Sequence, residues 1–302
     1  MSALDDLQRD GEDVVISSAD AVVHLEYDPT NLPSVEQVAE KHGGGNWTRF
    51  VCISDTHSKT FDVPHGDVLL HSGDLTQVGR EGEMKKTMEW IYSMPHKVKI
   101  VIAGNHDLPL HRGWYDNNWK KRSQKKLDFE PIHEWLVGKM AKESGVIYLE
   151  NQAVKFRVAP ERREWSVYGS PWQPEFFNWA FNYKRDEAEG LVSKYESTDI
   201  LLTHGPPHQI LDQTRGDEMV GCEALAAHIT CGRLRPRLHA FGHIHEAHGA
   251  HIHSWESTGV CEPLQVQNDI NYPIQLSPDD SEDEAAGRRE KLEPSPPEDG
   301  FC

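Results

Sequence analysis

The sequence is poor in basic residues: 302 residues include 31 Lys and Arg against 49 Asp and Glu, and the formal net charge at pH 7 is -18. The acidic excess is concentrated near the two ends, where residues 1–20 carry a net charge of -5 and residues 277–302 a net charge of -6. Proteins that bind long nucleic acids usually present a basic face to the phosphate backbone. The composition therefore argues against a long DNA or RNA as a partner.

Paired cysteines and long apolar runs are also missing. The five cysteines are odd in number and form no Cys-x-x-Cys pair, which fits a reducing compartment without a disulfide framework. No apolar run approaches the roughly 20 residues of a membrane helix, and the first residues show no apolar signal-peptide core. We therefore expect a soluble, cytoplasmic protein that does not enter a membrane.

One short basic run, Lys120–Arg122 followed by Lys125 and Lys126, stands out in the acidic background. A run of this kind can act as a nuclear localisation signal, which leaves the nucleus open as a compartment. The surrounding residues 110–129 are polar, and a solvated loop is the interpretation that we favour.

Composition divides the chain into three parts. Residues 1–45 form an acidic N-terminal extension that ends in three glycines, so we expect it to be partly flexible, with one edge strand over residues 20–27. Residues 46–276 contain the apolar runs of a folded domain. Residues 277–302 are rich in Pro, Glu, Asp and Ser with little to bury, which predicts a disordered acidic tail.

Short, β-branched apolar runs predict buried parallel strands in the middle part. The principal strands are expected over residues 49–53, 67–71, 98–103, 199–203 and 238–241, with three shorter ones over 146–149, 153–158 and 165–168. Helical periodicity is found over residues 83–93, 131–143, 186–195 and 223–229. The strand, helix and strand from residue 67 to residue 103 form a βαβ unit, and the whole pattern predicts an α/β fold.

Each principal strand ends in residues that can carry chemistry. The five strand-end motifs, in chain order, are Asp55-Thr56-His57, Gly73-Asp74, Gly104-Asn105-His106-Asp107, His204 and His243-Ile244-His245. Ligands of α/β sheets bind at the carboxyl ends of the strands, so these motifs are expected to converge. Taken singly, each has an ordinary explanation as a turn, a cap or a buried histidine; five in succession favour a site.

The types of side chain point to metal ions. Carboxylate, imidazole and amide-oxygen ligands suit Mn²⁺, Fe or Zn²⁺ better than metals that prefer thiolates. Seven ligands can hold two ions if one carboxylate bridges them, whereas a single structural zinc needs only four. We therefore expect two divalent metal ions, with Mn²⁺ as the first choice.

The five motifs together resemble the calcineurin-like metallophosphoesterase superfamily, and the resemblance spans residues 49–245. It is closer still to the metallophosphoesterase-domain-containing (MPPED-like) group. The stretches that carry this closer resemblance are residues 54–57, His71–Thr76, Gly169–Trp172, Thr203–Pro207 and Phe241–Glu246. The resemblance implies a four-layer α/β/β/α sandwich with two central sheets.

The resemblance also implies a role for each motif residue. Asp55, His57 and His245 would bind the first metal ion, and Asn105, His204 and His243 the second. Asp74 would bridge the two ions, and His106 would face the substrate phosphate as general acid. Asn105, His106 and Trp172 are the residues expected to contact substrate.

The implied activity is hydrolysis of phosphate esters. Hydroxide held between the two metals would attack phosphorus in line while His106 protonates the leaving oxygen. Small phosphodiesters such as cyclic nucleotides are the expected substrates. Protein phosphatases of the superfamily carry a second Asp and an Arg soon after Gly-Asp, and the matching stretch, Leu75–Arg80, departs from that pattern. The alternative function is a weakly active regulatory or scaffold module that binds nucleotide or metal; protein partners are not indicated.

Two further clusters leave alternatives open. Residues 171–182 hold five aromatic side chains, which could stack a nucleobase beside the metals or simply plug a loop. His248, His251 and His253 could form a third metal site, but no carboxylate accompanies them, and an exposed strand edge is the favoured interpretation.

Overall fold

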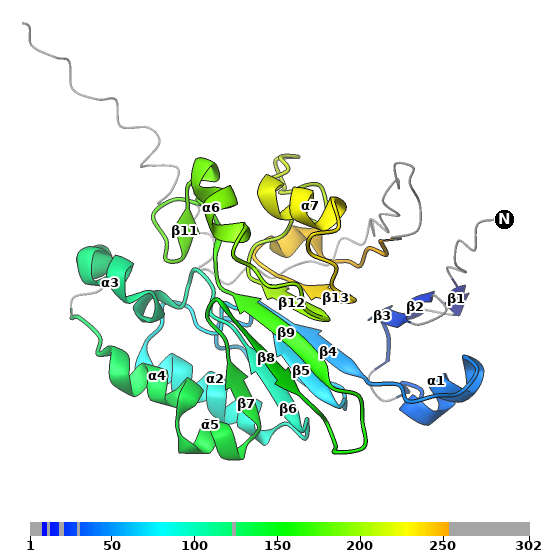
Figure 1. Ribbon diagram of the computed structural model, residues 1–302. Helices are drawn as coiled ribbons and strands as arrows, with labels where there is room; N and C mark the ends of the chain where they lie inside the picture. The colour runs from blue at the N-terminus through cyan, green and yellow to red at the C-terminus, as the bar shows by residue number, and fades with distance from the viewer. Residues whose placement is uncertain (1–7, 11–12, 18–20, 29–30, 123–124, 254–302) are drawn as a thin grey trace, which may run out of the picture. The chain divides into compact units, whose positions relative to one another are not determined.

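The computed structural model describes residues 8–253, except 11–12, 18–20, 29–30 and 123–124 (Figure 1). The tail expected over residues 277–302, and the last part of the domain expected over 46–276, lie outside the described residues. None of the helices in the described part combines the length and the hydropathy that a bilayer crossing requires.

The first central sheet is wholly parallel and has the order β4-β5-β6-β7. Its strands are β4 (Phe50–Ile53), β5 (Val68–His71), β6 (Val98–Val101) and β7 (Val146–Tyr148). Every residue of β5 and β6 is buried, as the β-branched runs predicted for strands covered on both faces. Helix α2 (Glu81–Ser93) connects β5 to β6, which confirms the predicted βαβ unit.

The second central sheet has the order β13-β12-β9-β8, in which only β8 is antiparallel to its neighbour. Its strands are β8 (Gln152–Phe156), β9 (Trp165–Ser170), β12 (Ile200–Thr203) and β13 (Leu238–Ala240). Two further strands, β10 (Gln173–Pro174) and β11 (Asn182–Tyr183), pair only with each other and close the aromatic loop between them.

Three apolar clusters show the order of the layers. Val68 and Leu70 of β5 pack with Ile200 and Leu202 of β12, so the two sheets meet face to face. Side chains alternate along a strand, and Leu69 therefore points the other way, into the cluster of α2 and α4. The outer face of the second sheet packs in the same manner against α6 and α7. The molecule is the four-layer α/β/β/α sandwich that was expected (Figure 1).

The helices begin and end for local reasons. Helix α2 buries Met84, Met88 and Ile91 on one face, at the spacing that predicted it. The predicted helix 131–143 is instead two helices, α4 (Phe129–Val137) and α5 (Lys139–Glu143). The break falls at Gly138, whose backbone is extended and where a Cβ would lie 2.5 Å from the carbonyl oxygen of Glu134.

Other helices differ modestly from the prediction. The segment 186–195 forms the 3₁₀ helix η3 (Arg185–Glu187) and α6 (Ala188–Val192), while α7 (Glu223–Thr230) extends one residue beyond its predicted end. The 3₁₀ helix η4 (His245–Ala247) follows β13.

The basic segment 110–129 is not simply a loop. It contains the end of η1 (Leu108–Leu110), α3 (Arg112–Asn118) and η2 (Trp119–Lys121). Leu110 and Tyr115 are buried in the core, so two apolar anchors fold a segment whose exposed residues are polar. The prediction of a loop was therefore wrong, whereas Lys120, Lys121, Lys125 and Lys126 are exposed, as a solvated segment requires.

The N-terminal region has more structure than the sequence predicted. Strands β1 (Gln8–Asp10), β2 (Asp13–Ser17) and β3 (Val22–Glu26) form an antiparallel sheet of their own. The predicted edge strand is β3, but it does not extend a central sheet. Helix α1 (Val35–Lys41) begins with a capping box, in which the side chains of Ser34 and Gln37 each accept a bond from the other's backbone N–H.

Candidate metal centre

The five strand-end motifs lie at the carboxyl ends of β4, β5, β6, β12 and β13. Because β4, β5 and β6 are parallel neighbours in one sheet, and β12 and β13 are parallel neighbours in the other, the ends within each sheet fall on the same edge. The packing of the two sheets brings both sets of ends to one place. The predicted convergence of the motifs is present in the structure.

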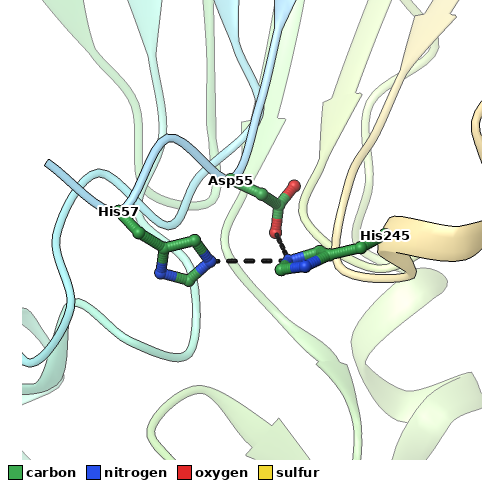
Figure 2. A group of neighbouring side chains, drawn as sticks. All are labelled: Asp55, His57 and His245. Atoms are coloured by element: carbon green, nitrogen blue, oxygen red, sulfur yellow. Dashed lines mark hydrogen bonds and ion pairs between the residues drawn. The ribbon is translucent and has the colours of Figure 1, made fainter. Parts of the chain in front are cut away.

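Asp55, His57 and His245 form the first group of potential ligands (Figure 2). Nε2 of His245 lies 3.3 Å from Oδ1 of Asp55 and 3.4 Å from Nε2 of His57. The three ligand atoms lie within 4.8 Å of one another although His245 is 188 residues from His57. Asp-x-His after β4 and the last histidine of His-x-His after β13 thus face a common point.

Asp74 connects this group to the others. Its Oδ2 lies 3.9 Å from Nε2 of His57 and 3.5 Å from Nε2 of His204. Asp74 belongs to two groups of potential ligands, one with His57 and His106 and one with Asp55 and His204. Asp55 likewise belongs to two groups. Oδ2 of Asp74 lies beside both His57 and His204, and a carboxylate in this position can be shared by two cations.

Asn105 and His204 face each other at the end of β6 and β12. Nε2 of His204 lies 2.9 Å from Oδ1 of Asn105, while its Nδ1 donates to the carbonyl of Ser72 at 2.8 Å. That donation fixes the tautomer and leaves Nε2 as the atom available for coordination. The ring of His243 lies 5.1 Å from that of His204, but the predicted ligand His243 is not in any group of potential ligands found among the described residues.

His106 is held on three sides. Its Nδ1 donates to the carbonyl of Gln77 at 2.7 Å, its backbone N–H donates to Oδ1 of Asp74 at 2.8 Å, and its ring stacks on Trp179 at 4.2 Å. The Gln77 bond again fixes the tautomer and leaves Nε2 free to exchange a proton. His106 also falls within the group of His57 and Asp74, so its ring reaches the edge of the candidate metal site.

Gln77 and Trp179 were not assigned a role from the sequence. Gln77 acts through its backbone carbonyl, which no side-chain pattern reveals. Trp179 lies in the aromatic segment noted in the sequence, and its contact with His106 shows that part of this segment supports the site. Trp172, the other aromatic residue singled out, packs instead against His111 and Phe181.

Asp107 holds two of the strand-end loops together. This fully buried carboxylate accepts the backbone N–H groups of Leu75, Thr76 and Gly104 at 2.9 to 3.1 Å, and the Thr76 hydroxyl at 2.7 Å. Burial and the charge of Asp74 raise the pKa of Asp107 to about 7. The last residue of the Gly-Asn-His-Asp motif therefore fixes the positions of the loops that carry Asp74 and Asn105.

The backbone is strained at the candidate ligands. Asp55, His57, Asp74 and His243 have φ angles of 53°, 46°, 53° and 73°, in the left-handed region that non-glycine residues rarely adopt. Strain of this kind typically costs about 1–3 kcal/mol per residue and accumulates at functional sites. Four strained residues in one place are difficult to explain by packing alone.

Glycines allow the loops to approach closely. A Cβ on Gly104 would lie 2.3 Å from Oδ1 of Asp74, and one on Gly242 would lie 2.1 Å from Oδ2 of Asp55. Both positions therefore exclude any side chain, which explains why glycine precedes the ligands in the third and fifth motifs.

Replacing Gly104 with alanine is expected to displace Asp74 and lower metal occupancy, with a loss of unfolding free energy of about 1–3 kcal/mol from overpacking. Thermal unfolding and elemental analysis of the purified variant measure both effects. Gly82→Ala is the matched control, because a Cβ there meets nothing within 4 Å and the residue lies in α2. Full metal occupancy in Gly104→Ala would contradict the close approach described above.

Electrostatics of the cluster favour cation binding. Burial lowers the pKa of His57 to about 4 and that of His243 to about 3, so both rings are neutral and can donate a lone pair at neutral pH. Burial acts in the same direction on His204, but the charge of Asp74 outweighs it and raises the pKa of His204 to about 9. A metal ion that binds His204 must therefore displace a proton.

The two acids remain ionised despite their burial. Burial would raise the pKa of Asp74, but the neighbouring charges of His204 and His106 hold it well below its usual range. For Asp55, burial is likewise outweighed by the hydrogen bond from His245 and the charge of His204. Two carboxylates, four imidazoles and the amide oxygen of Asn105 are a ligand set that suits divalent cations.

The three histidines beyond the last motif do not extend the site. His248, His251 and His253 follow η4 without regular secondary structure, so the expected strand edge is absent. The groups of potential ligands found among the described residues contain none of the three.

The fold and this cluster of ligands define a class of protein. Residues 42–247 match the calcineurin-like phosphoesterase family, and the chain belongs to that family. It is a metal-dependent phosphoesterase by family, and the family implies divalent metal ions.

Comparison with individual relatives identifies a group within this family. The chain is similar to the human metallophosphoesterase domain-containing protein 1, with 40% identity over 241 residues that cover 74% of this chain and 68% of the relative. The mouse protein of the same name matches to the same extent. A UPF0046 protein of Caenorhabditis elegans is 34% identical over 250 residues, which cover 76% of this chain and 61% of that protein. The resemblance to the metallophosphoesterase-domain-containing group is thereby confirmed.

Proposed function

We propose that this protein is a dinuclear metal-dependent phosphodiesterase that acts on small diesters, cyclic nucleotides among them. The observation that carries the proposal is the position of Asp74, whose Oδ2 lies 3.9 Å from Nε2 of His57 and 3.5 Å from Nε2 of His204, two histidines that we assign to different ions. Asp55, His57 and His245 would hold one ion, and Asn105, His204 and His243 the other, with Asp74 between them. Two ions would supply Lewis acidity and a nucleophile at neutral pH.

The proposed general acid is His106. Its Nδ1–H is committed to Gln77 and its ring is packed against Trp179, so Nε2 is the nitrogen that can deliver a proton to a leaving oxygen. Proton transfer requires the donor to lie within hydrogen-bond distance of that oxygen. Because Gln77 and Trp179 hold the ring, little rotamer freedom has to be lost before the proton is transferred.

The residues after Gly73-Asp74 support a small substrate rather than a phosphoprotein. Arg80 is the only basic residue in the stretch 75–80, and its guanidinium pairs with Glu83 at 2.7 Å at the start of α2. Arg80 therefore pairs with a residue of its own helix, and we do not assign it to binding a substrate phosphate. Thr76 is fully buried and bonds to Asp107.

Elemental analysis tests the dinuclear part of the proposal. We expect two ions per chain in active protein, loss of activity on treatment with a chelator, and the best recovery with Mn²⁺, because the proposed ligands are nitrogen and oxygen atoms. Protein of full activity that contains one ion or none would reject the shared role of Asp74.

A further inference from the structure

Phe176 is one of the few large apolar side chains that the described residues leave exposed, with 47% of its surface accessible. Its neighbours in the same aromatic segment behave differently: Trp179 and Phe181 are at most 4% exposed and pack into the core. The end of the segment that contains Trp179 and Phe181 is therefore part of the core, whereas the end that contains Phe176 is exposed to solvent. The plug alternative therefore describes Trp179 and Phe181 but not Phe176.

The exposed ring lies beside the candidate metal centre. Its centroid is 5.7 Å from the ring of His243, in an edge-to-face arrangement, and 4.5 Å from the ring of Phe177. His243 in turn contacts His204. A half-exposed apolar side chain thus lies at the edge of a polar cluster.

The loop that carries Phe176 is built to hold it in place. β10 and β11 pair at the base of the loop, and Gln173 adds a side-chain bond to the carbonyl of Ala180 at 2.9 Å. The side-chain amide of Asn182 donates to the carbonyls of Phe176 and Phe177 at 3.1 and 2.8 Å.

The conformation also has an energetic cost. Phe177 has a φ of 44° and Phe181 a φ of 52°, so two bulky residues of one short loop occupy the left-handed region. Non-glycine residues rarely adopt this conformation, and it persists where the surrounding structure fixes it. Strain together with cross-bracing indicates a preorganised platform.

We propose that Phe176 is a specificity-determining residue that stacks on an aromatic ring of the substrate, a nucleobase, when the phosphate lies at the metal centre. This inference rests on the proposed function and names the substrate class for the same site. Stacking on an aromatic side chain tolerates any base, because every base has a π-face. Phe176 therefore selects nucleotides over simple alkyl phosphates rather than one base over another.

Two cyclic diesters of matched reactivity test the proposal. Adenosine 2′,3′-cyclic phosphate and glycerol 1,2-cyclic phosphate share the five-membered ring and an alkoxide leaving group, but only the first has a base. Base–aromatic stacking corresponds to a change in affinity of roughly 5- to 150-fold. In Phe176→Ala we expect KM for the adenosine substrate to rise by about tenfold, with kcat and the glycerol substrate changed less than about twofold.

A binding measurement separates recognition from turnover. Calorimetry of the metal-loaded protein with adenosine 3′-phosphate should show the same weakening of roughly tenfold in Phe176→Ala, and none for glycerol 2-phosphate. Phe176→Trp, which keeps an aromatic face, should retain wild-type affinity. Phe61→Ala is the matched control, since Phe61 is 49% exposed and has a similar edge contact, with Trp90 at 5.1 Å.

The outcomes are distinct. If hydrolysis of both substrates falls equally in Phe176→Ala, or the variant binds less metal, the ring supports His243 and the stacking role is rejected. If both substrates are hydrolysed as well as by wild type, the inference fails while the proposed function stands. If wild type hydrolyses neither, the proposed function itself fails, and weaker binding of adenosine 3′-phosphate in Phe176→Ala would still support stacking by the site.

Discussion

Asp74→Asn is expected to lose phosphodiester turnover almost completely and to retain fewer than two metal ions per chain. A neutral amide oxygen cannot bridge two cations as a carboxylate does. Asp74 also accepts the backbone N–H of His106, so its substitution affects the proposed acid as well as the metals. Loss of residues that only hydrogen-bond to metal ligands already costs roughly 10- to 100-fold, and a shared ligand should cost more than about 100-fold.

The control for Asp74→Asn is a second buried carboxylate. Asp212 is 1% exposed and accepts the backbone N–H of Gly221 at 2.9 Å, so Asp212→Asn tests the effect of the same change outside the candidate ligands. Turnover by this control should stay within about threefold of wild type, a loss of less than 1 kcal/mol. Unchanged turnover and metal content in Asp74→Asn would show that the carboxylate is not a shared ligand.

His106→Ala is expected to keep both metals but slow hydrolysis by roughly 10²- to 10⁴-fold when the leaving group is an alcohol. The reason is the loss of proton donation, which an alkoxide needs. For a leaving group such as p-nitrophenolate, which is stable as an anion, the loss should be much smaller. Rates with glycerol 1,2-cyclic phosphate and bis-p-nitrophenyl phosphate give the comparison directly.

Two results would remove His106 from this role. Equal losses with both leaving groups would show that the residue does not act as an acid. A fall in metal content would show that it acts as a ligand, as its place beside His57 and Asp74 would allow. His133→Ala is the matched control, because His133 is half-buried and stacks on Phe129.

The sequence predicts the central fold well because local and long-range requirements agree there. The runs that form β5 and β6 are apolar throughout, and a strand covered on both faces needs that composition. Each run ends in residues that have no place in a core, which identifies the edge where the site lies. Composition does not reveal which residues contact the ligands. It also does not reveal that four of the ligands adopt positive φ angles.

What the sequence could not predict depends on contacts between distant segments. The carbonyl of Gln77 positions His106 across 29 residues, and Trp179 reaches the same ring across 73 positions of sequence, without a pattern that marks either. The folding of Tyr115 into the core is decided by tertiary packing. Periodicity describes one element at a time, and these features belong to pairs of elements.

Turnover by metal-saturated wild-type protein tests the central claim most directly. Chelator-treated protein reloaded with Mn²⁺ should hydrolyse bis-p-nitrophenyl phosphate, and Asp74→Asn prepared in the same way should not. A module that only binds nucleotide or metal would show negligible turnover in either form. Metal-saturated wild type that hydrolyses neither diesters nor monoesters would contradict the assignment of this site to phosphoester hydrolysis.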